Sequence, residues 1–137
     1  MPYTGFAIID DDQLFRHILK AQLNKILEQE KSVLSFENGK EAIQYLQDNL
    51  PQLGDVVIPK VVFLDINMPI MNGWEFLDEF KKMKDLITEQ ITIYMITSSV
   101  DRRDEKRAGE YSEVNKFVVK PVTSNQLIEL LEADNLI

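Results

Sequence analysis

Four polar sites along the chain each directly follow a short apolar run, and their residue types suit the chemistry of metal ions and phosphate groups. They are Asp10-Asp11-Asp12 after FAII, Asp65 after VVFL, Thr97 after IYMI and Lys120 after FVV. Ligands of open α/β sheets bind beyond the carboxyl ends of the strands, so four neighbouring parallel strands would bring these residues to one edge. Carboxylates, a hydroxyl and an ammonium group at that edge could hold a divalent cation and a phosphoryl group.

The apolar periodicity predicts the strands and helices that would position these residues. Strands are expected over residues 6–9, 32–36, 61–64, 91–96 and 116–119. Helices with apolar residues three and four positions apart are expected after Asp12, after Asn38-Gly39, after the loop at 69–73 and over 124–132, and a charged helix is expected over 101–111. This alternation predicts an α/β fold, a doubly wound five-stranded parallel sheet with helices on both faces. In the order 2-1-3-4-5 the direction reverses between strands one and three, beside Asp10, Asp11 and Asp65.

The size and charge of the chain narrow its possible functions. A length of 137 residues predicts a single domain over 1–137. The net charge of −8 disfavours direct binding to nucleic acid or to an anionic membrane. The absence of cysteine excludes thiolate metal sites and cysteine nucleophiles. Because the sequence also shows no signal peptide and no membrane span, the cytoplasm is the expected location.

The predicted grouping of three carboxylates calls for a cation. Without one, mutual repulsion would raise the pKa of at least one carboxyl group or destabilise the site. Mg²⁺ prefers oxygen ligands and is commonly held by one or two carboxylates together with a substrate phosphate. The sequence therefore predicts a Mg²⁺ site at Asp10, Asp11 and Asp65.

The four sites lie in segments that resemble those of the receiver domain of two-component response regulators, in matching order and across essentially the whole chain: IIDDD, VVFLDINMPIMNGWEFL, IYMITSS and FVVKPVT. The resemblance implies a flavodoxin-like fold and a stand-alone response regulator. Such a protein takes a phosphoryl group from a phosphohistidine on a histidine kinase or a histidine phosphotransfer protein. It catalyses only its own phosphorylation and dephosphorylation, and it signals by conformational change to a downstream protein. The implied output face is helix four, strand five and helix five, around residues 100–111 and 117–131.

The resemblance also implies which residues handle the metal ion and accept the phosphoryl group. Asp65 would be the phosphoacceptor and would contribute to the metal site. Asp11 would bind Mg²⁺ directly, Asp10 would hold it largely through water, and the backbone carbonyl of Asn67 would complete the set. This agrees with phosphoryl transfer in general, in which the protein mainly positions groups and neutralises charge.

A second set of residues is implied in binding the phosphate and in the response to it. Lys120 would supply a second cation, Thr97 would hydrogen-bond a phosphoryl oxygen, and Ser98 is small enough to leave access. Phe117 stands where the family has a switch aromatic, here without a hydroxyl group. For the backbone, the resemblance implies that Gly73 relieves the loop after Asp65 and that Pro121 follows a cis peptide bond. More residues separate the acidic triplet from Asp65 than is usual in the family, and the loop at 52–60 accounts for the difference.

Other interpretations of these residues remain open from the sequence. Asp10 to Asp12 could serve as helix caps, and Asp12 could be only a cap even where its neighbours bind metal. A haloacid-dehalogenase-like phosphatase is disfavoured because Leu14 stands where its motif needs Thr or Val. An FMN binder is disfavoured because an acidic loop would repel the phosphate. A receiver fold that serves as a phosphorylation-independent docking module is the main alternative.

Overall fold

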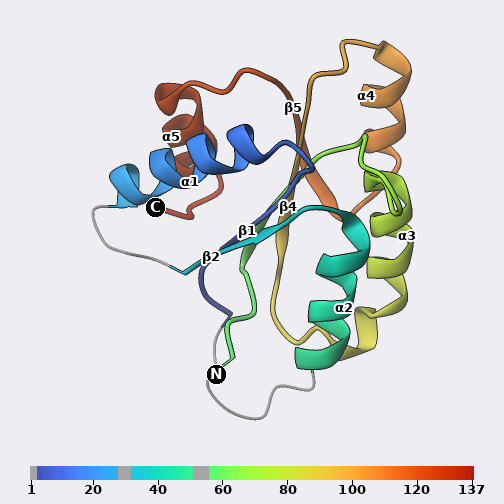
Figure 1. Cartoon of the computed structure of the whole chain (residues 1–137). Helices are drawn as coiled ribbons and strands as arrows, with labels where there is room; N and C mark the ends of the chain where they lie inside the picture. Colours follow the sequence, from blue (N-terminus) through green and yellow to red (C-terminus); the bar gives the residue numbers. More distant parts are fainter. Residues whose placement is uncertain (1–2, 28–31, 51–55) are drawn as a thin grey trace.

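The computed structural model describes residues 3–27, 32–50 and 56–137. Within these ranges, five strands form one parallel sheet in the order β2-β1-β3-β4-β5 (Figure 1). The strands are β1 (Phe6–Ile9), β2 (Val33–Phe36), β3 (Val61–Leu64), β4 (Thr92–Thr97) and β5 (Val114–Val119). The predicted doubly wound α/β fold is confirmed, and β2, β4 and β5 differ from the predicted strands by one or two residues at their ends.

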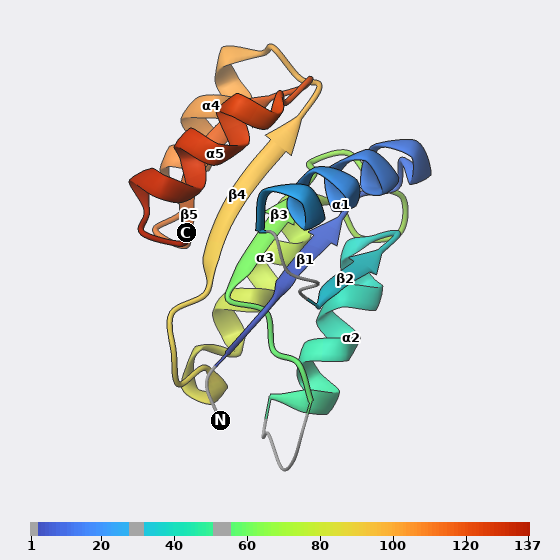
Figure 2. The ribbon, with the colours of Figure 1, turned by 90° about the vertical axis from the view of Figure 1, so that its left-hand side faces the viewer.

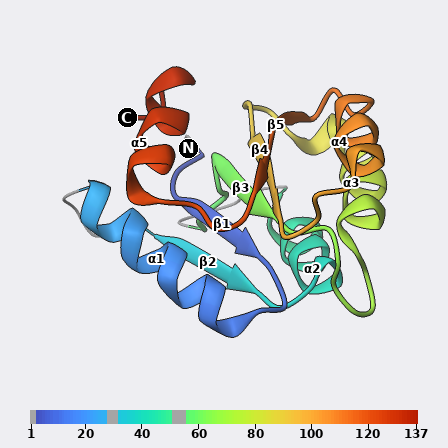
Figure 3. The ribbon, with the colours of Figure 1, turned by 90° about the horizontal axis from the view of Figure 1, so that it is seen from above.

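The helices cover both faces of this sheet. They are α1 (Gln13–Leu27), α2 (Gly39–Asn49), α3 (Gly73–Lys82), α4 (Arg102–Gly109) and α5 (Ser124–Ala133), with a short 3₁₀ helix η1 (Lys84–Leu86) after α3. Helices α1 and α5 lie on one face, and α2, α3 and α4 lie on the other (Figures 1 and 3). The sequence did not predict η1, because one turn is too short to show a helical period. Of the predicted loop at 52–60, residues 52–55 lie outside the described residues, and 56–60 belong to no helix or strand.

The strands in the middle of the sheet are buried on both faces. Every residue of β1, β3 and β4 is buried, as the uninterrupted apolar run of β3 predicts. Alternate side chains enter two separate apolar clusters, with Phe63 on the side of α1 and α5 and Leu64 on the side of α2 and α3. Strands β2 and β5 form the edges of the sheet and are only partly buried. The buried central strands therefore fix the backbone at Asp10, Asp65 and Thr97, whereas Lys120 follows the edge strand β5.

Helix α1 contacts the sheet along a narrower face than its apolar pattern predicts. Leu19 and Leu23 are fully buried, and Phe15 packs against the same cluster from a partly buried position. Leu14 and Ile18 share the helical spacing but are 67% and 47% exposed. Phe15, Leu19 and Leu23 are spaced four residues apart and face the sheet. Leu14 and Ile18 each precede one of them by one position and lie at the border of that face. Figure 2 shows α1 and α5 side by side in front of the sheet.

The described part of the chain contains no helix that is both long enough and apolar enough to span a lipid bilayer.

Candidate functional site

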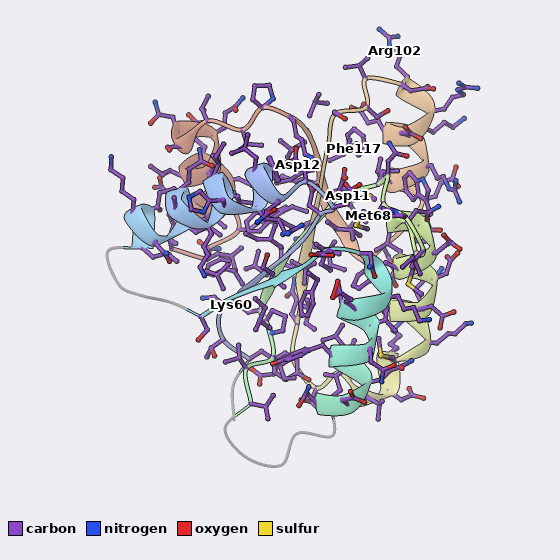
Figure 4. All side chains as sticks on the ribbon, in the orientation of Figure 1. Asp11, Asp12, Lys60, Met68, Arg102 and Phe117 are labelled. Carbon is purple, nitrogen blue, oxygen red and sulfur yellow. The ribbon has the colours of Figure 1, made fainter. Side chains whose placement is uncertain are left out.

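The four polar sites meet at one edge of the sheet, which we call the carboxyl edge because the strands end there. The backbone N–H of Asp65 donates to the carbonyl of Ile9 at 2.9 Å, so β1 and β3 end together. The N–H of Lys120 donates to the carbonyl of Thr97 at 2.7 Å, which aligns the ends of β4 and β5. Figure 4 shows Asp11 and Asp12 near this edge, whereas Lys60 marks the other end of β3. The predicted convergence is therefore present.

Three carboxylates form a compact cluster at the carboxyl edge. Asp10, Asp11 and Asp65 each place one oxygen so that all three oxygens lie within 4.8 Å of one another. Asp10 and Asp65 are 2% and 6% exposed, whereas Asp11 is open to solvent. The cluster thus combines two buried carboxylates with one that solvent, a metal ion or a phosphate group can reach.

Asp12 has a different role from the other two members of the acidic triplet. Its Oδ1 accepts a hydrogen bond from the backbone N–H of Phe15 at 3.1 Å, which is the geometry of a helix cap for α1. Its own backbone N–H donates to Oδ1 of Asp10 at 2.9 Å. The interpretation of Asp12 as a cap is therefore confirmed.

Lys120 brings a positive charge into the acidic cluster from the end of β5. Its Nζ lies 2.7 Å from Oδ2 of Asp10 and 4.0 Å from Oδ1 of Asp65, and its side chain is 17% exposed. The ammonium group also lies over the ring of Phe15, 4.2 Å from the ring centroid. In this structure Lys120 thus pairs more closely with Asp10 than with Asp65.

The charge balance of the cluster remains negative, and Asp65 shows the effect. The pKa of Asp65 is raised from 3.8 to about 6, first by burial and then by the neighbouring charge of Asp10. The ammonium of Lys120 and a hydrogen bond from the backbone N–H of Ile66 act in the opposite direction. Burial and neighbouring negative charges both disfavour the ionised form of a carboxyl group, so a raised pKa is the expected result for Asp65.

The donor set of the cluster fits a hard divalent cation. All three ligand candidates are carboxylate oxygens, and their separation allows one ion to contact each of them. Oxygen-only ligands suit Mg²⁺, Ca²⁺ or Mn²⁺ and not the softer metals that prefer sulfur. Asp10, Asp11 and Asp65 could therefore hold a metal ion.

The hydroxyl of Thr97 is held by the loop that follows β4. Thr97 is fully buried, and its Oγ1 accepts a hydrogen bond from the backbone N–H of Ser99 at 3.1 Å. The hydroxyl of Ser99 donates to Oδ2 of Asp104 at 2.5 Å and accepts from the backbone N–H of Asp101 at 3.3 Å. A chain of hydrogen bonds therefore connects Thr97 with the first turn of α4.

Comparison with known proteins agrees with the geometry of the site. A family model described as the response regulator receiver domain matches residues 6–132. A chemotaxis protein CheY homolog of Campylobacter jejuni is 34% identical over 125 residues, which cover 91% of this chain and 87% of that protein. A solved two-component response regulator from Cytophaga hutchinsonii is 29% identical with a TM-score of 0.76, over 96% of this chain and 97% of that one. The solved bacteriophytochrome response regulator AtBRR is 27% identical with a TM-score of 0.72, and the match covers 100% of this chain and 96% of that one.

This chain belongs to the response regulator receiver domain family. It is a CheY-like receiver of two-component signalling, and its acidic cluster fits the aspartyl phosphate and Mg²⁺ site of such a domain. Receiver domains are signalling proteins, not classical enzymes, and they interact with histidine kinases and downstream effectors. The phosphorylation-independent alternative is not favoured, because the receiver-domain model and the CheY homolog match most of the chain.

The structure also places the backbone residues that the resemblance implied for the receiver. The Lys120–Pro121 peptide bond is cis, as expected. A Cβ atom added to Gly73 would lie 2.4 Å from the carbonyl oxygen of Asp65, so only glycine fits at the start of α3. Asn67 is exposed in the loop after β3, and the role of its carbonyl stays a prediction.

Two further residues that the resemblance implied for the receiver, Ser98 and Phe117, lie in different environments. Ser98 is exposed directly after Thr97. Phe117 of β5 is partly buried and packs against the apolar cluster beneath α2, α3 and α4. Figure 4 shows Phe117 on β5. The role of Phe117 in switching stays a prediction.

Sequence reasoning missed two contacts that complete the edge of the site. The first is the ring of Phe15 against Lys120, since the apolar spacing of α1 predicts only a core position for Phe15. The second is the bond between Ser99 and Asp104. Asp104 lies in the charged run DRRDEKR at residues 101–107, and its sequence does not indicate which of these charged residues contacts Ser99.

Proposed function

We propose that Asp65 is the phosphoacceptor and that a phosphohistidine of a histidine kinase or histidine phosphotransfer protein is the donor. A carboxylate oxygen of Asp65 would attack phosphorus, the P–N bond to the imidazole would break, and the imidazole would leave with the electron pair. The observation that carries this proposal is the gathering of Asp10, Asp11 and Asp65 within 4.8 Å beside the ammonium of Lys120.

The contacts of the three carboxylates favour Asp65 over its neighbours as the nucleophile. Both oxygens of Asp10 are engaged, one by the ammonium of Lys120 and the other by the backbone N–H of Asp12. Asp11 is exposed and begins a loop, so its position is less fixed. Asp65 directly follows the buried strand β3 and lies 4.0 Å from Lys120, close enough for the cation to stabilise charge that develops on a transferred group.

The metal ligands follow from the same arrangement. Asp11 would bind Mg²⁺ directly, Asp10 would hold it through water, and the carbonyl of Asn67 and an oxygen of Asp65 would complete the protein's share. When bound, Mg²⁺ would neutralise negative charge on the transferred oxygens. With these groups the protein would catalyse only its own phosphorylation and dephosphorylation.

The response to phosphorylation would begin at Thr97. Its hydroxyl would leave the N–H of Ser99 and donate to a phosphoryl oxygen, while Lys120 forms an ion pair with the same group. Ser98, small and exposed, leaves the approach open. Phe117 would move inward into the space that Thr97 leaves. A phosphoryl group adds about −1.5 to −2 charge, enough to shift a loop that has two arrangements.

The output face would be α4, β5 and α5, which a downstream protein would contact. Strand β5 is a partly exposed edge with Val119 39% exposed, and a mainly apolar groove lies between β5 and α5. We further propose that residues 1–137 form a single receiver domain and that the protein acts in the cytoplasm.

Labelling with a small phosphodonor tests the assignment of Asp65. With acetyl phosphate and Mg²⁺, the unaltered protein should form an acid-stable, base-labile phosphoprotein, and Asp65→Asn should form none. Asp12→Asn is the matched control, because asparagine also caps helices and the charge change is the same. Equal labelling of Asp65→Asn would move the acceptor elsewhere. Absence of labelling in the unaltered protein, from acetyl phosphate or from a histidine kinase, would favour the docking module.

A further inference from the structure

Lys120 is surrounded by two carboxylates and one aromatic ring. Its Nζ donates to Asp10 at 2.7 Å, lies 4.0 Å from Oδ1 of Asp65, and lies 4.2 Å from the centroid of the Phe15 ring. The carboxylates belong to the proposed reaction. The ring of Phe15 has no role in that reaction. It belongs to helix α1, whereas the two carboxylates follow the ends of β1 and β3.

Phe15 is held firmly enough to act as a fixed surface. Its backbone N–H donates to the capping carboxylate of Asp12, which sets the first turn of α1. On the side of the sheet, Phe15 packs against the apolar cluster that contains Leu19 and Leu23. The ring is thus supported by the core on one side and contacts the ammonium group of Lys120 on the other.

An aromatic ring attracts a cation without competing for its hydrogen bonds. The negative face of the ring holds an ammonium group electrostatically, yet it neutralises no charge and leaves the N–H donors for oxygen acceptors. A carboxylate in the position of Phe15 would instead bind the N–H groups that the phosphoryl oxygens need. The ring is also broad. The ammonium group of Lys120 could therefore move by about 1 Å toward Asp65, far enough to form a charge-assisted hydrogen bond there, and still lie over the ring.

We propose that Phe15 is a positioning residue that keeps the ammonium group of Lys120 over the carboxyl edge while it passes from Asp10 toward the phosphoryl group on Asp65. This inference rests on the proposed function. Without the ring, Lys120 would spend part of its time extended into solvent, because a long side chain gains rotamer freedom there. The cation would then be in place for a smaller fraction of encounters with the phosphodonor.

The test compares labelling rates of two variants, one that removes the aromatic ring with a modest change in side-chain volume and one that keeps the ring. With acetyl phosphate and saturating Mg²⁺, Phe15→Leu should be labelled about three to ten times more slowly than the unaltered protein, as expected for loss of one partly buried cation–π contact. Phe15→Tyr keeps the aromatic face and should label within about twofold of the unaltered rate. Leu14→Ala, on the neighbouring exposed position, is the control and should label normally.

A double-mutant cycle separates positioning from a structural effect. In a Lys120→Ala background, Phe15→Leu should slow labelling no further, because the ring no longer has a cation to hold. The side-chain protons of Lys120 give a readout that is independent of labelling. Their resonances should lie upfield in the unaltered protein and in Phe15→Tyr, because of the ring current, and should move downfield in Phe15→Leu. If Phe15→Leu fails to fold, Phe15→Met replaces it as the apolar variant.

The possible failures of the two proposals differ. If the unaltered protein is not labelled at all, the proposed function is wrong. If the unaltered protein is labelled and Phe15→Leu is labelled equally fast, the positioning role is wrong. An equal slowing by Phe15→Leu with and without Lys120 would also overturn it, because the ring would then act on the structure and not on the lysine.

Discussion

Two parts of the carboxyl edge are held in place by different means. Asp10 and Asp65 follow β1 and β3, whose residues are all buried, so the core fixes the backbone that carries these carboxylates. The hydroxyl of Thr97 instead accepts one hydrogen bond from the backbone N–H of Ser99, in the partly exposed loop at residues 98–101, and the adjacent strand β5 is a partly exposed edge. We call these the acidic part and the loop part of the site.

The difference suits a protein that must react at one place and change shape at another. Phosphoryl transfer depends on groups held in fixed positions, which buried strands provide. A conformational switch needs a segment whose local opening costs little, and partly exposed loops held by a few hydrogen bonds meet that requirement. Lys120 belongs to both parts, because it lies at the end of β5 and contacts the carboxylates of the acidic part.

The largest expected effect comes from disturbing the acidic part at Gly73. In Gly73→Ala the new methyl group would meet the carbonyl oxygen of Asp65 at 2.4 Å, and backbone on both sides must shift. We expect a loss of about 2–3 kcal/mol in the free energy of unfolding, measured in urea, together with slower labelling. Gly109→Ala is the control, since nothing lies within 4 Å of the added atom and its stability should be unchanged or slightly higher. Equal stability of the two variants would contradict the close approach at Gly73.

The second prediction concerns the connection between the two parts. Lys120→Ala should still fold and should still accept phosphate, although more slowly, but labelling should no longer change the loop part. We expect amide hydrogen exchange over residues 98–111 to change on labelling of the unaltered protein by a factor of about 5 or more, and to stay constant in the variant. Lys116→Ala, an exposed lysine on the same strand, is the control. A labelled Lys120→Ala protein with the full exchange response would refute the coupling role.

The third prediction uses the raised pKa of Asp65 and applies without metal ion. Because the pKa is about 6 in the folded protein and 3.8 ordinarily, the folded state binds a proton that the unfolded state releases between these pH values. The stability due to this proton is present below about pH 4 and is lost as the pH rises through about 6. Asp65→Asn should therefore match the unaltered protein near pH 4 and exceed its stability at pH 7 by about 1–2 kcal/mol, a range that allows for solvent screening.

Urea unfolding in the presence of a chelator, at several pH values, measures this difference. Addition of Mg²⁺ at pH 7 should stabilise the unaltered protein more than Asp65→Asn, because the cation offsets the repulsion only where the third carboxylate is present. A constant stability difference between pH 4 and pH 7 would show that Asp65 ionises normally and that the acidic part carries no excess repulsion.

The same division explains which features the sequence predicted. Asp10, Asp65, Thr97 and Lys120 could be placed together because each directly follows a strand-forming apolar run, and parallel strands bring such positions to one edge. The contacts that depend on how helices dock were not predictable. Whether Phe15 faces Lys120 depends on the rotation of α1 against the sheet.

The closer pairing of Lys120 with Asp10 than with Asp65 also could not be predicted from the sequence. It depends on a difference of little more than an ångström between two carboxylates at the same edge. Apolar periodicity determines which face of an element is buried, but it does not determine side-chain positions at that precision. The loop part has little apolar pattern of its own, so its hydrogen bonds became visible only in the structure.

The smallest expected effect belongs to the loop part itself. Ser99→Ala removes the donor to Asp104 and the acceptor for the N–H of Asp101, and we expect a loss of about 1 kcal/mol in the free energy of unfolding. Hydrogen exchange should accelerate in the first turn of α4 and stay unchanged in β1 and β3. Ser98→Ala, an exposed neighbour, should show neither change. If Ser99→Ala instead accelerated exchange equally in the central strands, the loop would be part of the same cooperative unit as the core. Phosphorylation could then not rearrange the loop without loosening the carboxylate that we propose as the phosphoacceptor.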